Sequence, residues 1–275
     1  FFQTWDLAGS FPKILEDAVV GKAARDVYAD GQAMLKRIIE ERWLTANGVV
    51  ALLPAASVGE DIEIYGDESR GEIAMTWHGL RQQTAKASDR NNLCLADYVA
   101  PKISGVHDWI GVFAVTTGLG CEERARAFEA ASDDYSAIML KALADRLAEA
   151  FAERLHERVR REFWGYAPDE RFKPAALIAE NYRGIRPAPG YPACPEHAVK
   201  GDLFDLLDAP AIGMGITESY AMTPPASVAG FYLSHPEAKY FAVGPIGEDQ
   251  RNDFSRRAAM HNAMAPDEKR VLVAV

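Results

Sequence analysis

A long helical pattern between residues 132 and 163 constrains the fold most strongly. Bulky apolar residues recur there at every fourth position, with Leu140 alongside: Leu143, Leu147, Phe151, Leu155, Val159 and Phe163. This spacing places them on one face of an α-helix. Ser132 or Asp133 can cap the first turn, because a side-chain oxygen accepts hydrogen bonds from otherwise unpaired amides. About 31 residues at roughly 1.5 Å each give a rod of about 46 Å, long enough to cross a whole domain.

The other apolar patterns predict a mixture of helices and strands. Further helices are expected over 16–44, 200–210 and 248–270, and strands over 48–55, 60–67, 93–101, 108–118, 216–222, 226–235 and 239–246. Residues 71–83 fit a strand that runs into a helix. Because regular βαβ alternation is missing, the order of elements predicts an α+β fold, with helices around a largely antiparallel sheet. We expect a single domain over residues 1–275 whose N-terminal edge is truncated, since the chain opens in mid-pattern at Phe1.

Composition excludes several classes of function. The chain of 275 residues is 48% apolar and carries a net charge of −10, which argues against general binding to nucleic acids or anionic membranes. Cys94, Cys121 and Cys194 lie far apart and form no CxxC pair, so reduced thiols in a cytoplasmic protein are expected rather than disulfides or a zinc knuckle. No apolar run approaches the ~18 residues of a membrane span, and no signal peptide is visible.

The common catalytic signatures are absent from the sequence. GxGxxG, GxxxxGK[ST] and GxSxG do not occur, and the helix segment HERVR has Arg160 where a zincin needs its second histidine. The histidines considered as metal ligands are scattered singly: His78, His107, His197, His235 and His261. A hydrolase with a metal assembled from these distant histidines is the most remote alternative.

The proline-rich segment, residues 181–197, reads NYRGIRPAPGYPACPEH. Pro187, Pro189 and Pro192 fix their own φ angles, so little chain entropy remains to be lost when a ligand binds. Gly190 allows a ligand to approach the backbone closely, because it has no Cβ. We therefore interpret this segment as a preformed ligand-binding surface.

The motif RPxxGYPxCPxH within this segment resembles the activation (reactivation) domain of cobalamin-dependent methionine synthase. Segments on both sides of the motif resemble the same family: LADRLAEAFAERLHERVRREFWGYAP upstream, and TESYAM and ASVAGFYLSHPEAKYFAV downstream. The resemblance covers about residues 1–250. It implies a C-shaped α+β single domain with a twisted antiparallel sheet, flanking helices and one long central helix. The C-terminal stretch 251–275 diverges from the usual ending of the family.

The resemblance also implies a function. Members bind S-adenosylmethionine, dock on the cobalamin-binding module and support reductive methylation of inactive cob(II)alamin to methylcobalamin, with electrons from flavodoxin or a flavoprotein reductase. Such a module belongs to methionine biosynthesis and is not competent for methionine synthesis alone, because it has neither the cobalamin-ligating histidine motif nor zinc thiolates. A non-catalytic S-adenosylmethionine sensor or interaction domain is the alternative.

Site residues follow by position in the family motifs. Arg186 suits the ligand carboxylate, because its planar guanidinium can donate two charge-assisted hydrogen bonds. The other matches are Ala188, Gly190 and Tyr191 in the motif, Tyr240 and Phe241 in a strand pair that completes the site, and two acids of the site region, Glu149 and Glu180. Phe241 stands where the family usually has a second tyrosine. A further family acid would lie before Phe1, so weakened binding is expected.

No catalytic residue is expected, because cob(I)alamin is a strong nucleophile, the sulfonium is already activated, and the protein has mainly to position the methyl group. His197 is interpreted as a surface or loop-ordering residue rather than a metal ligand, and Cys194 as packed rather than nucleophilic. Two interpretations of the basic cluster Arg154, Arg158, Arg160 and Arg161 remain open: a docking patch for acidic flavodoxin, or an ordinary solvated helix end.

Overall fold

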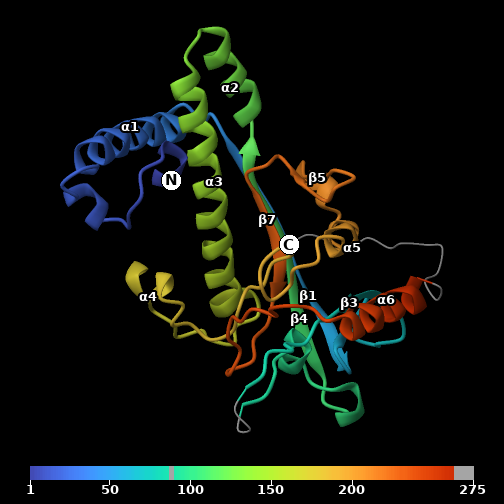
Figure 1. The fold of residues 1–275 in the computed structure, drawn as a ribbon. Helices are drawn as coiled ribbons and strands as arrows, with labels where there is room; N and C mark the ends of the chain where they lie inside the picture. The colour runs from blue at the N-terminus through green and yellow to red at the C-terminus, as the bar shows by residue number, and fades with distance from the viewer. Residues whose placement is uncertain (87–89, 263–275) are drawn as a thin grey trace. The chain divides into compact units, whose positions relative to one another are not determined.

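The computed structural model describes residues 1–86 and 90–262 and contains a five-stranded antiparallel sheet. The strand order is β3-β2-β1-β4-β7, and β1, β4 and β7 run side by side (Figure 1). Their bounds are Thr45–Val58 for β1, Asp61–Tyr65 for β2, Ile73–His78 for β3, Asp108–Leu119 for β4 and Ser227–Tyr232 for β7. Two short strands, Gly215–Ile216 (β5) and Met222–Thr223 (β6), form a separate pair.

Local sequence explains the hairpin of β1 and β2. Val58 pairs with Asp61 across a tight turn in which Gly59 adopts a φ of +62°, a conformation that glycine reaches without steric cost. Ile62 and Ile64 alternate with acidic residues, and both isoleucines are buried, as expected for a strand with one apolar face. β3 continues the antiparallel order, with Asp61 opposite His78.

The chain divides into two compact units. The first unit comprises 1–47, 115–153 and 222–228, and holds helix α1 (Gly21–Glu40), helix α2 (Cys121–Ala130) and most of helix α3 (Asp134–Arg158). Two short 3-10 helices, η1 (Phe2–Trp5) and η2 (Lys13–Glu16), precede α1. Its larger core joins the three helices through these residues, among others: Met34, Ile38, Trp43, Ala125, Leu140, Leu143 and Ala144.

Small residues and hydrogen bonds set the packing of α3 within the first unit. Ala144 is fully buried, and its carbonyl accepts a hydrogen bond of 2.8 Å from Thr117 Oγ1 on β4. Asp133 caps the helix, since its Oδ1 accepts a hydrogen bond of 3.0 Å from the Ser136 amide. The sequence-based prediction of a capped, unusually long helix is therefore confirmed, and a π-helical turn, η5 (Val159–Phe163), extends it.

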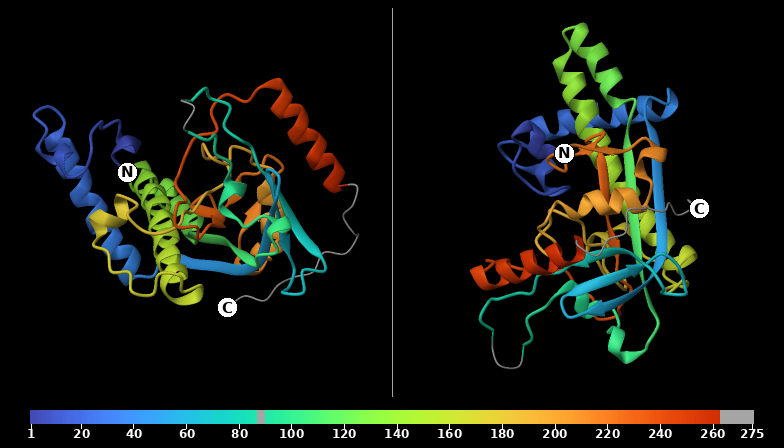
Figure 2. Two further views of the ribbon diagram at one scale, coloured as in Figure 1. Left: turned by 90° about the horizontal axis from the view of Figure 1, so that it is seen from below. Right: turned by 90° about the vertical axis from the view of Figure 1, so that its right-hand side faces the viewer.

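The second unit comprises 48–114, 154–221 and 229–275, of which 87–89 and 263–275 lie outside the described residues. Its helical elements are η3 (Leu95–Tyr98), η4 (Lys102–Ser104), η5, α4 (Pro174–Ile178), α5 (Val199–Leu206), η6 (Ala209–Ile212) and α6 (Glu248–Asn262). Helix α6 lies beside β3 (Figures 1 and 2). Arg257 holds it there through Asp61 and through a hydrogen bond of 2.9 Å to the Gly79 carbonyl.

Most predicted elements are present, with shifted ends. α1 is shorter than the predicted helix, β1 is longer than the predicted strand, and β2, β4, β7 and α5 lie where expected. The segment 216–222 contributes only the ends of β5 and β6, and no helix follows β3 within 79–83. The predicted helix over 248–270 is α6, and its part beyond Asn262 lies outside the described residues.

Two strand predictions are wrong. Residues 95–98 form the 3-10 helix η3 instead of a strand, because the Asp97 carboxylate turns back to accept a hydrogen bond of 2.9 Å from the Cys94 amide. Residues 239–246 form no strand, so Tyr240 and Phe241 do not belong to a strand pair. That segment instead bonds to loops: the Ala242 carbonyl accepts from Gln82 Nε2 at 2.7 Å, and the Val243 amide donates to the Pro192 carbonyl at 2.8 Å.

Helix α2 was not predicted, because its exposed sequence CEERARAFEA lacks a clear apolar stripe and buries only Cys121 and Ala125. None of the helices in the described ranges combines the length and the apolar character that crossing a membrane requires.

Candidate ligand-binding site

The proline-rich segment lies along the outer edge of β7. Ile185 and Leu233 exchange two backbone hydrogen bonds, of 2.9 and 3.1 Å, and the Phe231 amide donates to the Pro187 carbonyl at 2.9 Å. A Cβ on Gly230 would lie 2.4 Å from the Pro187 oxygen, so glycine is required for this close approach. Prolines are tolerated here because an edge position does not need every amide donor.

A tight turn follows this edge and presents the motif residues. The Tyr191 amide donates to the Ala188 carbonyl at 3.2 Å, and the Gly190 amide donates to the Cys194 carbonyl at 2.8 Å. Gly190 has a φ of +92°, and a Cβ there would lie 2.3 Å from His197 Cε1. The imidazole of His197 therefore lies against the turn, which agrees with its interpretation as a loop-ordering residue.

Cys194 is packed, as the sequence predicts. Its side chain is buried, and burial raises the pKa of the thiol to about 11. A thiol with so high a pKa is almost entirely protonated near neutrality and is a poor nucleophile. Cys94 and Cys121 are likewise free and buried.

Tyr240 completes the arrangement from the far end of the chain. Its hydroxyl accepts a hydrogen bond of 2.8 Å from the Arg186 amide. Tyr191 is 55% exposed and Tyr240 is 37% exposed, which is high for tyrosine rings. The structure thus brings together Arg186, Ala188, Gly190, Tyr191 and Tyr240, and Phe241 follows in the chain, half-buried. Their contacts with a ligand remain predictions.

Arg186 is half-buried, and its guanidinium contacts a histidine that sequence reasoning did not assign to the site. His156 is fully buried near the end of α3, with its Nδ1 3.4 Å from Arg186 Nη1 and its Nε2 3.5 Å from the Tyr166 hydroxyl. Burial, and then the charges of Arg160 and Arg186, lower the pKa of His156 well below its ordinary value. One feature of the sequence could have indicated that His156 is buried: it lies four residues after Ala152, on the same face of the helix, and that face is buried.

A buried ion pair lies next to this histidine. The Arg160 guanidinium meets the Glu170 carboxylate at 2.7, 2.8 and 3.0 Å, with both side chains almost entirely removed from solvent. Arg160 also lies over the Tyr182 ring, 4.1 Å from its centroid. Arg160 is therefore part of the core of the second unit and cannot contribute to a surface patch.

The rest of the basic cluster is neutralised locally. Arg154 and Arg161 both pair with Glu157, at 2.5 and 2.8 Å, and Arg158 pairs with Glu162 at 2.8 Å. Each cation has a carboxylate within one helical turn, which favours the interpretation of an ordinary solvated helix end over a docking patch.

The two predicted acids differ in their surroundings. Glu180 is exposed just after α4, with a φ of +55°. Glu149 is half-buried on the part of α3 that belongs to the first unit. A role for either carboxylate near a sulfonium stays a prediction.

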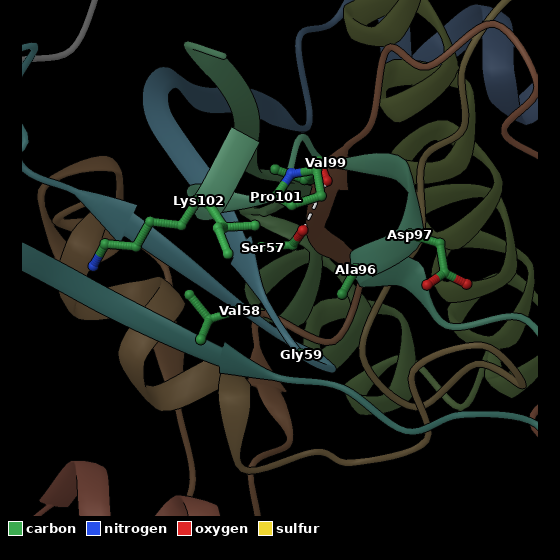
Figure 3. A pocket seen from close by; sticks show the side chains of 9 residues that line it. Ser57, Val58, Gly59, Ala96, Asp97, Val99, Pro101 and Lys102 are labelled. Carbon is green, nitrogen blue, oxygen red and sulfur yellow. Dashed lines mark hydrogen bonds between the residues drawn. The ribbon is translucent and has the colours of Figure 1, made fainter. Parts of the chain in front are cut away.

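A cavity in the second unit lies away from the proline-rich segment. It has a volume of about 640 Å³ and is lined by Ser57, Val58, Gly59, Ala96, Asp97, Val99, Pro101, Lys102 and Ile103 (Figure 3). Within it, Ser57 Oγ donates to the Val99 carbonyl at 2.9 Å. None of the predicted site residues lines this cavity. Over 1–86 and 90–262 there is also no group of three or more His, Cys, Asp or Glu residues that could hold a metal ion.

Comparison with known proteins matches this chain along most of its length. The family model described as "Vitamin B12 dependent methionine synthase, activation domain" matches residues 1–259. A solved structure, "Crystal Structure of the MetH Reactivation Domain bound to AdoHcy", is similar with a TM-score of 0.89 and 56% sequence identity, over 94% of this chain and 80% of that one. These matches confirm the resemblance and the α+β fold. The chain belongs to the family of activation domains of vitamin B12-dependent methionine synthase.

Proposed function

We propose that this chain binds S-adenosylmethionine at the proline-rich segment and supports reductive methylation of cob(II)alamin to methylcobalamin, which reactivates methionine synthase. The observation that carries the proposal is the ordered position of Arg186, whose amide donates to Tyr240 and whose guanidinium lies on His156. A solved relative with 56% identity is bound to AdoHcy, which is S-adenosylmethionine without its transferable methyl group.

The chemical groups at the segment fit the parts of this ligand. The planar guanidinium of Arg186 suits the α-carboxylate, because it can donate two parallel charge-assisted hydrogen bonds. Tyr191 and Tyr240 offer exposed aromatic surface for the adenosyl group. Phe241 has no hydroxyl, so it can contribute its ring or its backbone to the site but no hydrogen bond through a second phenol.

The chain's part in the chemistry is to position its ligand. A cobalamin-binding partner module, on the same or a companion chain, would hold the cobalamin, and after one-electron reduction this cofactor would supply the nucleophile for the methyl group. The sulfonium is a good leaving group without acid catalysis, so the protein has to orient the methyl group and exclude water.

Electrons would come from flavodoxin or a flavoprotein reductase, which we infer from family membership. The cluster at the end of α3 does not support this partner, because Arg160 is buried and its neighbours are paired with carboxylates. Substitutions elsewhere on the surface would map the docking site of such a partner.

Isothermal titration calorimetry with S-adenosylmethionine tests the binding step. Arg186→Ala should weaken binding by roughly 10- to 100-fold, the equivalent of about 1.4–2.8 kcal/mol for a lost charge-assisted contact. Arg183→Ala is the matched control, because Arg183 is an exposed arginine of the same segment that donates to the Ser234 carbonyl at 2.9 Å. Equal affinities for wild type and Arg186→Ala would show that the carboxylate binds elsewhere.

Reactivation needs a second assay. The chain is mixed with a cob(II)alamin-loaded cobalamin module, reduced flavodoxin and S-adenosylmethionine, and the visible spectrum of the cobalamin is followed. Conversion to methylcobalamin that depends on this chain would support the proposal. Binding of S-adenosylmethionine without any conversion would instead favour a sensor or interaction domain.

A further inference from the structure

We propose that His156 is a positioning residue for ligand binding: its neutral imidazole holds the guanidinium of Arg186 in the orientation that receives the ligand carboxylate. The inference rests on the proposed function of the segment. It assigns a role to a fully buried histidine that contacts the Arg186 guanidinium.

Hydrogen-bond chemistry determines which tautomer this requires. A guanidinium has N–H donors and no acceptor, so the contact of 3.4 Å between Arg186 Nη1 and His156 Nδ1 forms only if Nδ1 is unprotonated. The proton of the neutral ring then resides on Nε2, where the Tyr166 hydroxyl, 3.5 Å away, can accept it. Arg186 thus specifies the tautomer, and the Tyr166 hydroxyl, which can accept or donate, is compatible with it.

Aromatic packing fixes the plane of the imidazole. The Tyr232 ring stacks on it with centroids 4.9 Å apart and an interplanar angle of 17°. The Tyr182 ring meets it edge-on, with centroids 5.0 Å apart and an angle of 80°. Rings from β7 and from the proline-rich segment thus hold the plane of the imidazole, whose Nδ1 lies toward Arg186.

Electrostatics keep the ring neutral. The charged groups next to it are the guanidinium groups of Arg160 and Arg186, which together with burial lower the pKa of His156 well below its ordinary value. The Glu170 carboxylate is held in the bidentate pair with the Arg160 guanidinium. A protonated imidazole would place a second donor and a second positive charge against Arg186, and the contact would be lost.

The consequence for binding is preorganisation. An arginine side chain loses much rotamer freedom when it is fixed by a ligand. Where His156 already limits that freedom, the ligand does not have to supply the ordering, and affinity rises without any new contact to the ligand. Two opposite ends of Arg186 are held in this way, its amide by Tyr240 and its guanidinium by His156.

The test is a double-mutant cycle on S-adenosylmethionine affinity, measured by calorimetry. His156→Leu removes the acceptor, whereas His156→Asn has nearly the same size and can place Oδ1 where Nδ1 was. We expect Leu to weaken binding roughly tenfold and Asn to restore it to within about threefold of wild type. In an Arg186→Ala background, His156→Leu should cause no further loss.

The outcomes separate this inference from the proposed function. If wild type does not bind, or Arg186→Ala binds as wild type does, the proposed site is wrong. If Arg186→Ala loses binding but His156→Leu has the same effect with and without Arg186, then His156 acts through the fold alone and the inference is overturned. Nitrogen NMR of the wild-type imidazole is independent of any variant's folding: it should show unprotonated Nδ1 and protonated Nε2, and the opposite tautomer refutes the proposal.

Discussion

The buried pair of Arg160 and Glu170 provides the sharpest test of how the second unit is held together. We predict that Glu170→Ala will strongly destabilise the protein. The Arg160 side chain has no exposed surface, that of Glu170 is 5% exposed, and three contacts of 2.7–3.0 Å join them. Removal of the carboxylate leaves a guanidinium buried without its counter-charge, which typically costs about 3–5 kcal/mol.

A matched control lies in the same stretch of chain. Arg158 and Glu162 make a pair of 2.8 Å, but their side chains are 43% and 45% exposed. Water can solvate Arg158 when its partner is removed, so Glu162→Ala should cost only about 0–1 kcal/mol. The two variants each remove one glutamate from a pair with arginine, and they differ mainly in burial.

The free energy of unfolding would be measured by urea titration, followed by circular dichroism and by tryptophan fluorescence. The midpoint should fall strongly for Glu170→Ala and hardly at all for Glu162→Ala, with unchanged slopes. Arg160→Met combined with Glu170→Leu should recover much of the loss, because an apolar pair leaves no charge buried. If Glu170→Ala and Glu162→Ala differ by less than about 1 kcal/mol, the argument from burial is refuted.

Three further predictions concern the candidate site. Because the pKa of His156 is lowered in the folded protein, His156 takes up a proton in the unfolded chain at a pH at which it stays neutral in the folded one. The free energy of unfolding should therefore fall as the pH drops below about 6.5, by up to about 1.4 kcal/mol per pH unit. Urea titrations from pH 6.5 to 5 should show a smaller dependence of this free energy on pH in His156→Asn than in wild type. Gly190 has a φ of +92°, and a Cβ there would lie 2.3 Å from His197 Cε1. Gly190→Ala should therefore lower the free energy of unfolding, measured by urea titration, by about 1–3 kcal/mol. A neutral effect would mean that the turn rearranges. Tyr240→Phe removes the acceptor of the Arg186 amide, a loss of about 0.5–1.5 kcal/mol, so that amide should exchange its hydrogen faster; unchanged protection would contradict the assigned bond.

Much of the fold could be predicted because the relevant signals are local. The apolar repeat from Leu143 to Val159 is a property of consecutive residues, and it predicts α3 whatever the rest of the chain does. The alternation at Ile62 and Ile64 predicts β2 in the same way. The two strand predictions were wrong because the conformation of each segment depends on contacts that a local pattern does not reveal. The 239–246 segment forms hydrogen bonds with Pro192 and Gln82, which are distant in the sequence. The Asp97 side chain caps a helical turn over residues 95–98.

The same division holds for the candidate site. The order of residues in RPxxGYPxCPxH was enough to identify the segment, the family and the stiffness of the backbone, because proline and glycine act on their own φ angles. Only the tertiary structure showed what the Arg186 side chain lies on. His156, Tyr166 and Tyr232 are distant from one another or from the motif along the chain, and each has an ordinary sequence context. Their importance comes from burial and from hydrogen-bond geometry, which exist only after the helix, the loop and the strand have packed together.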